Sequence, residues 1–217
     1  MDTPTCYCCD NLAAVGQGDH VPPKGIFPKG CFSNTKPIIV PSCQAHNQEQ
    51  SSSDEYLKFI LASASESTPS DVLESTVRGL VRHIKNDSKS LNNYGIELKN
   101  NEVILDGSAP VNFGSLCIAL KKVARGIYYH HSNGKKKLIG SLVVFPIFLG
   151  VDPHASPEER ERLINIENLT KYEMENYKMF EVLEKYFSYQ VIEYDKVSTI
   201  NMLFYQDKIV SVCHAKA

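Results

Sequence analysis

The chain has 217 residues and a formal net charge of −2 at pH 7, with 42% hydrophobic and 22% charged residues. This composition is typical of a globular protein that is long enough to bury its own core. It excludes the overall basicity that attracts nucleic acid, so a nucleic-acid partner would need a local basic surface. The chain has no apolar run long enough to span a membrane and no basic, apolar signal segment, so we expect a cytoplasmic protein.

The cysteine pattern favours metal binding over disulfides. Seven is an odd number, and three of the cysteines crowd together at the start of the chain. Cys6 and Cys9 form one pair with two intervening residues, and Cys43 and His46 form a second. Tetrahedral zinc takes four ligands of these types from short paired spacings. We therefore predict a structural zinc at these four residues, with Cys8 as an alternative to Cys6 or Cys9.

The segment between the two pairs predicts two strands followed by a helix. A first strand should end at Asp19-His20, because the prolines at 22 and 23 remove backbone donors. Residues 35–41 contain three consecutive β-branched residues and predict a second strand. The run of serines at 51–53 predicts the start of a helix, with Asp54 and Glu55 in its first turn.

Three side chains of this segment suit hydrolytic chemistry. The oxygens of Asp19 and Asn47 are suitable ligands for a divalent cation such as Mg²⁺, and a neutral His20 imidazole can take a proton from water. Asp54 and Glu55 are either additional oxygen ligands or acids that favour the start of their helix. The residues alone leave these two alternatives open.

The order of these motifs resembles a zinc-braced HNH nuclease of the ββα-metal type. The resemblance covers residues 1–62 and depends on the paired cysteines, Asp-His-Val-Pro-Pro-Lys, Val-Pro-Ser-Cys-Gln-Ala-His-Asn and Ser-Ser-Asp-Glu-Tyr. It implies that His20 is the general base and that Asp19 and Asn47 bind a catalytic Mg²⁺ or Mn²⁺. It also implies a phosphodiester hydrolase that acts on DNA, with RNA as an alternative, and allows a homodimer. Related small proteins act in phage or bacterial defence.

One departure from the family pattern supports an alternative function. The family has a middle Asn on the strand before the second zinc pair, whereas residues 36–40 here read Lys-Pro-Ile-Ile-Val and the nearest Asn is Asn34. The alternative is a catalytically inactive module, stabilised by zinc, that binds nucleic acid or another protein.

The remaining residues predict an α+β domain at 71–217, after a linker at 63–70. We expect helices on an antiparallel sheet that positions substrate or binds a partner. The expected elements are a helix from Ser70, a hairpin over 96–105, a helix over 113–128, a buried strand over 142–149 interrupted at Pro146, a helix from Ser156 to about Tyr186 with a kink near 165–170, and strands over 189–194 and 200–213.

Basic residues gather after the helix over 113–128. Lys121, Lys122 and Arg125 are expected on its exposed side. Beyond its end, a Tyr-Tyr-His-His run is followed by three lysines. This cluster is either a phosphate-binding surface or a solvated turn. The residues that we predict to contact nucleic acid are Lys24, Lys135, Lys136 and Lys137.

Overall fold

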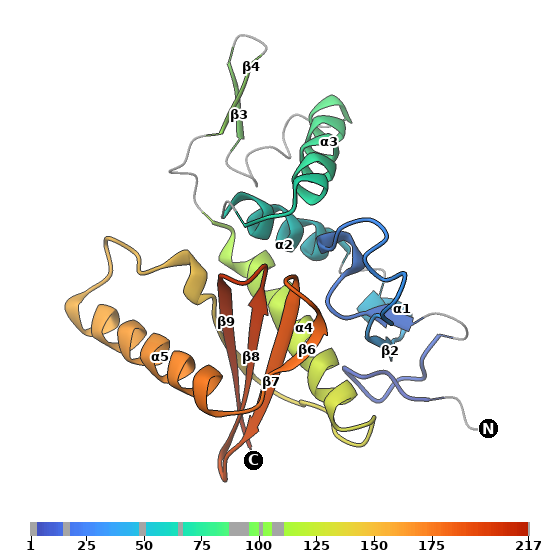
Figure 1. The fold of residues 1–217 in the computed structure, drawn as a ribbon, viewed down its shortest axis with the longest axis vertical. Helices are drawn as coiled ribbons and strands as arrows, with labels where there is room; N and C mark the ends of the chain where they lie inside the picture. Colours follow the sequence, from blue (N-terminus) through green and yellow to red (C-terminus); the bar gives the residue numbers. More distant parts are fainter. Residues whose placement is uncertain are drawn as a thin grey trace.

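The structure is a computed structural model that describes residues 4–14, 18–47, 51–64, 67–86, 96–99, 102–105 and 111–216. It shows an α+β fold with antiparallel sheets, as the sequence predicts (Figure 1). In Figure 1, α4 (Phe113–His131) passes across the middle of the molecule, between the N-terminal elements and a five-stranded sheet.

The N-terminal elements occur in the expected order. β1 (Gly18–His20) pairs antiparallel with β2 (Ile39–Pro41), and the single turn η1 (Lys24–Ile26) lies between them. The short helix α1 (Gln44–Asn47) and the longer α2 (Ser51–Ser63) follow. The second strand is shorter than the predicted 35–41, because only its last three residues face β1 in the ladder.

The helix and the hairpin that follow α2 agree closely with the sequence prediction. α3 (Ser70–Asn86) begins directly after Pro69. β3 (Ile96–Lys99) and β4 (Glu102–Leu105) form the expected antiparallel hairpin.

Helix α4 supplies the centre of the core. The side chain of its N-cap residue Asn112 accepts a hydrogen bond from the Ser115 amide, which satisfies a free donor of the first turn. The residues of α4 that lie at most 1% exposed recur at helical spacing, as expected of a core-facing stripe; they are Leu116, Ala119, Leu120, Val123, Ala124 and Ile127.

The five-stranded sheet has the order β5-β9-β8-β7-β6 and all of its neighbours are antiparallel. Along β8, Ile200, Met202 and Phe204 are fully buried and belong to the same core as the α4 stripe. The strands are β5 (Leu142–Phe145), β6 (Phe180–Leu183), β7 (Phe187–Glu193), β8 (Val197–Phe204) and β9 (Lys208–Ala215).

The predicted interruption of the 142–149 strand at Pro146 is confirmed, but the strand does not resume beyond it and is only partly buried. β5 ends at Phe145, and the next residue, Pro146, has no amide with which to continue the ladder. A single 3-10 turn, η3 (Ile147–Leu149), follows. β5 lies at the edge of the sheet, and Val143 on its outer side is 54% exposed.

The predicted helix from Ser156 to Tyr186 is right at its start and wrong at its end. α5 (Pro157–Asn176) begins with a capping box between Ser156 and Glu159, but it is one continuous helix that ends ten residues early. The chain then enters the sheet as β6, where Phe180 stacks on Tyr189 of β7 with ring centroids 5.5 Å apart. Tertiary pairing therefore overrides the local helical pattern.

The elements before and after the predicted linker at 63–70 share buried contacts. α2 packs on α4 and on η1, and buried residues of the N-terminal elements share a single hydrophobic cluster with α4 and the sheet. The hydroxyl of Tyr205, at the turn after β8, donates a hydrogen bond to the Ile26 carbonyl of η1. None of the helices in the described ranges is both long and apolar enough to cross a membrane.

Candidate metal centre and active site

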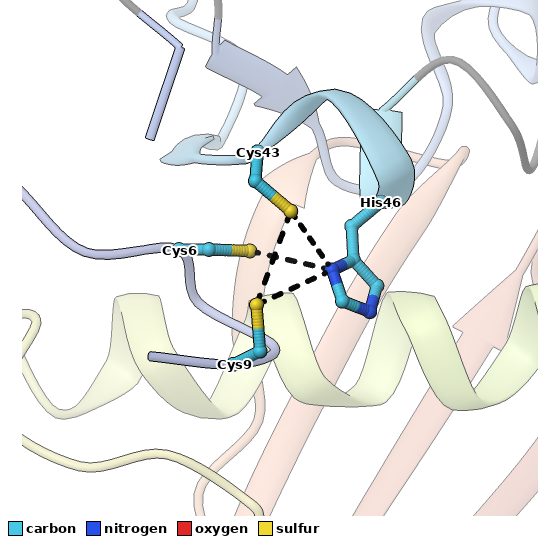
Figure 2. A group of neighbouring side chains, drawn as sticks. All are labelled: Cys6, Cys9, Cys43 and His46. Carbon is cyan, nitrogen blue, oxygen red and sulfur yellow. Dashed lines mark hydrogen bonds between the residues drawn. The ribbon is translucent and has the colours of Figure 1, made fainter. Parts of the chain in front are cut away.

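The two predicted zinc pairs come together (Figure 2). Thr5 and Leu12 form an antiparallel bridge, and the Cys6 amide donates to the Asn11 carbonyl at 2.8 Å, so residues 6–11 form a tight turn that presents two thiols. Cys43 lies just before α1, and His46 lies within it. The four candidate ligand atoms lie within 4.8 Å of one another.

The distances fit tetrahedral zinc. His46 Nδ1 lies 3.6 Å from Cys6 Sγ, 3.6 Å from Cys9 Sγ and 3.2 Å from Cys43 Sγ. The sulfurs of Cys9 and Cys43 are 3.9 Å apart. Ideal zinc bond lengths place a nitrogen and a sulfur ligand about 3.6 Å apart and two sulfur ligands about 3.8 Å apart. Cys8 is not a member of this group, so the structure selects Cys6 and Cys9 as the candidate ligands of the first pair.

The surroundings of the clustered thiols favour a bound cation. Burial opposes ionisation of Cys6, but hydrogen bonds from the backbone at Cys43, Cys8 and Cys9 outweigh it and lower the pKa of the Cys6 thiol. Burial raises the pKa of Cys9 to about 11, and the neighbouring Cys6 and Cys43 thiols add to this rise. Because clustered thiolates repel each other, a bound cation is needed to hold them together in the ionised form.

Lys137 supports this centre instead of facing solvent. Its ammonium donates to the Cys9 carbonyl at 2.8 Å and to the Thr5 hydroxyl at 2.9 Å, and it lies 3.3 Å from a carboxylate oxygen of Asp10. The ammonium therefore fixes the turn that carries the first ligand pair. Of the other lysines predicted to bind nucleic acid, Lys136 lies 3.3 Å from Glu193.

Lys136 is nevertheless 63% exposed, and the remaining two of these lysines also face solvent. Lys24 in η1 and Lys135 in the turn after α4 are both exposed.

The predicted catalytic residues lie on β1 and α1, close in sequence to the Cys3His cluster. His20 and Asp19 occupy β1, opposite Ile39 and Val40 of β2. Neighbouring side chains of a strand point to opposite faces, and accordingly Asp19 is buried while His20 is half-buried. Asn47 directly follows His46 at the end of α1 and is also half-buried.

The sequence analysis missed a buried polar network around Asp19. Lys122 of α4 places its ammonium 3.2 Å from Asp19 Oδ2 and 2.6 Å from Asp54 Oδ2, and its side chain is only 3% exposed. The Tyr7 hydroxyl donates to the same Asp19 oxygen at 2.8 Å. The expectation that Lys122 lies on the exposed side of its helix is therefore wrong.

Burial governs the ionisable groups of this network. It raises the pKa of Asp54, an effect that the hydrogen bond and charge of Lys122 partly offset. It also raises the pKa of Tyr7 well above its usual range, and the Cys8 and Asp19 charges act in the same direction. Asp54 Oδ1 is buried with no hydrogen-bond partner among the described residues. The acid at the start of α2 is thus part of a partly buried ion pair.

Comparison of the chain with protein-family models, with curated proteins and with solved structures found no match.

Proposed function

We propose that the N-terminal unit is a metal-dependent phosphodiester hydrolase of the HNH type that acts on DNA. The observation that carries the proposal is the Cys3His cluster, which joins the turn before β1 to the helix after β2. The cluster joins the segment that precedes β1, which carries Asp19 and His20, to the helix that ends in Asn47, in the order that the resemblance implies. A structural zinc ion binds four protein ligands in a tetrahedron and so fixes the segments that carry them.

In the proposed reaction, His20 takes a proton from water and the resulting hydroxide attacks the phosphorus opposite the leaving oxygen. Asp19 and Asn47 would hold Mg²⁺ or Mn²⁺, and the chemistry that such a cation supplies is charge stabilisation at the leaving oxygen. Lys24, four residues after His20 and exposed, would contact a phosphate of the same strand. RNA presents the same phosphodiester and is an alternative substrate.

The environment of Asp19 favours a second candidate function. Its carboxylate already has a buried cation as a partner, because Lys122 lies 3.2 Å away. An ammonium at this position takes the place of the positive charge that a catalytic ion brings. The second candidate is therefore a zinc-stabilised module that binds nucleic acid or a protein without cleaving it.

Cleavage of supercoiled plasmid and of RNA by zinc-loaded protein, in Mg²⁺ or Mn²⁺, decides between the two candidates. Wild type is compared with His20→Ala and with the matched control His154→Ala, which removes an exposed histidine from a loop before α5. A general base contributes about 10²–10⁴-fold, so His20→Ala should lose at least about 100-fold in rate while His154→Ala keeps it.

If zinc-loaded wild type cleaves neither substrate, the hydrolase proposal fails. Binding of labelled DNA and RNA then tests the second candidate. Equal rates for wild type and His20→Ala would instead remove His20 from the reaction.

A further inference from the structure

The network around Lys122 contains more negative than positive charge. Asp19 and Asp54 each contribute one carboxylate, and their ion pairs in the described structure both go to the single ammonium of Lys122. Tyr7 contributes a neutral donor. With both acids ionised, the group carries one uncompensated negative charge, and Asp54 Oδ1 has no partner among the described residues. The cluster therefore favours additional positive charge.

Lys122 contacts the carboxylate that the proposed reaction needs for its cation. A divalent ion bound to Asp19 would lie within a few ångströms of the ammonium, and like charges at such distances repel strongly where water is excluded. The Lys122 side chain is 3% exposed and the Asp19 side chain 7% exposed, so solvent and salt screen the repulsion weakly.

We propose that Lys122 is the resident counter-ion of Asp19 and competes with the divalent cation for it. Helix α4, outside the motif, then sets how tightly the zinc-braced unit binds Mg²⁺ or Mn²⁺. The Lys122 ammonium weakens cation binding in the wild type, and its removal leaves the buried carboxylate of Asp19 and the half-buried carboxylate of Asp54 available to one ion. This inference rests on the proposed function only in taking Asp19 as a ligand of the cation.

The test is Mn²⁺ binding to zinc-loaded protein, measured by electron paramagnetic resonance without nucleic acid. Lys122→Gln removes the charge and keeps a polar side chain. Lys121→Gln is the matched control, because it removes one positive charge from the neighbouring, half-buried position of the same helix. We expect Lys122→Gln to bind Mn²⁺ at least tenfold more tightly than wild type, Lys121→Gln to bind it as wild type does, and Asp19→Asn in the Lys122→Gln background to remove the gain.

Lys122→Gln also removes the ammonium from the buried Asp19 and the half-buried Asp54, which is destabilising in the absence of an ion. If Lys122→Gln is unfolded without Mn²⁺, it should recover the circular dichroism spectrum of the folded protein when Mn²⁺ is added. In that case Mn²⁺ replaces the missing ammonium, and the competition is measured as a gain in stability. A folded Lys122→Gln protein with unchanged or weaker Mn²⁺ affinity overturns the inference, as does an unfolded one that Mn²⁺ does not rescue.

The two proposals fail independently. Tighter Mn²⁺ binding by Lys122→Gln, together with no cleavage by wild type, keeps the inference and removes the hydrolase. Cleavage that depends on His20, together with unchanged Mn²⁺ affinity in Lys122→Gln, does the reverse.

Discussion

Gly126 is the point at which α4 meets the strand that carries the predicted catalytic residues. A methyl group added there would lie 2.5 and 2.7 Å from the two γ-carbons of Val21 and 3.0 Å from its β-carbon. Val21 directly follows His20 in the chain. Rotation of the Val21 side chain moves the γ-carbons but not the β-carbon, so Gly126→Ala must displace either the helix or the end of β1.

The magnitude follows from two opposing effects. Overpacking a well-packed contact costs about 1–3 kcal/mol, whereas replacing a helical glycine by alanine gains about 1 kcal/mol. Gly79 in α3 is the matched control, because a methyl group there meets nothing within 4 Å. Gly79→Ala should therefore stabilise the protein, and Gly126→Ala should be less stable than Gly79→Ala by about 1–3 kcal/mol in urea unfolding.

The reasoning is refuted if Gly126→Ala stabilises the protein as much as Gly79→Ala does. That result would mean that α4 and β1 are not in close contact at Val21. Where Gly126→Ala folds and retains zinc, a reduced cleavage rate would show that the position of β1 matters for the reaction.

Two further predictions concern the acid stability of the protein and its metal content. Lys216 and Tyr128, with Lys136, hold the pKa of Glu193 at about 2, below its usual 4.5. Because the folded protein favours the ionised form of Glu193, this stabilisation is present above pH 4.5 and is lost as the pH falls toward 2. The unfolding free energy of Glu193→Gln should therefore change less over that pH range than the unfolding free energy of wild type. Elemental analysis should find one zinc per chain in wild type and in Cys8→Ala but none in Cys9→Ala, because only Cys9 belongs to the ligand cluster; equal zinc in both variants would contradict this assignment.

The Cys3His cluster could be predicted because it depends on residues close together in the sequence. Each ligand pair spans four residues, and the two pairs lie on a turn and a short helix whose geometry follows from neighbouring residues. The start of α5 was predictable for the same reason, since the Ser156 capping box acts within one turn.

The Lys122 network could not be predicted in this way. Helical periodicity distinguishes the apolar face from the polar one, and by that rule a lysine belongs in solvent. Lys122 is buried because Asp54 lies opposite it, 68 residues away in the chain. The predicted end of α5 was wrong because Phe180 stacks on Tyr189 of β7 and so belongs to the sheet. The first error concerns a pairing between segments 68 residues apart in the chain, and the second concerns a hairpin between the neighbouring strands β6 and β7.

The central claim is that the zinc-braced unit uses His20 and a divalent cation to hydrolyse phosphodiesters. The most direct test is the plasmid-nicking rate of zinc-loaded wild type with and without Mg²⁺, beside zinc-loaded His20→Ala. The account predicts nicking by wild type only when Mg²⁺ is added, and a rate at least about 100-fold lower for His20→Ala. Nicking that persists without the cation, or that His20→Ala retains in full, would contradict it.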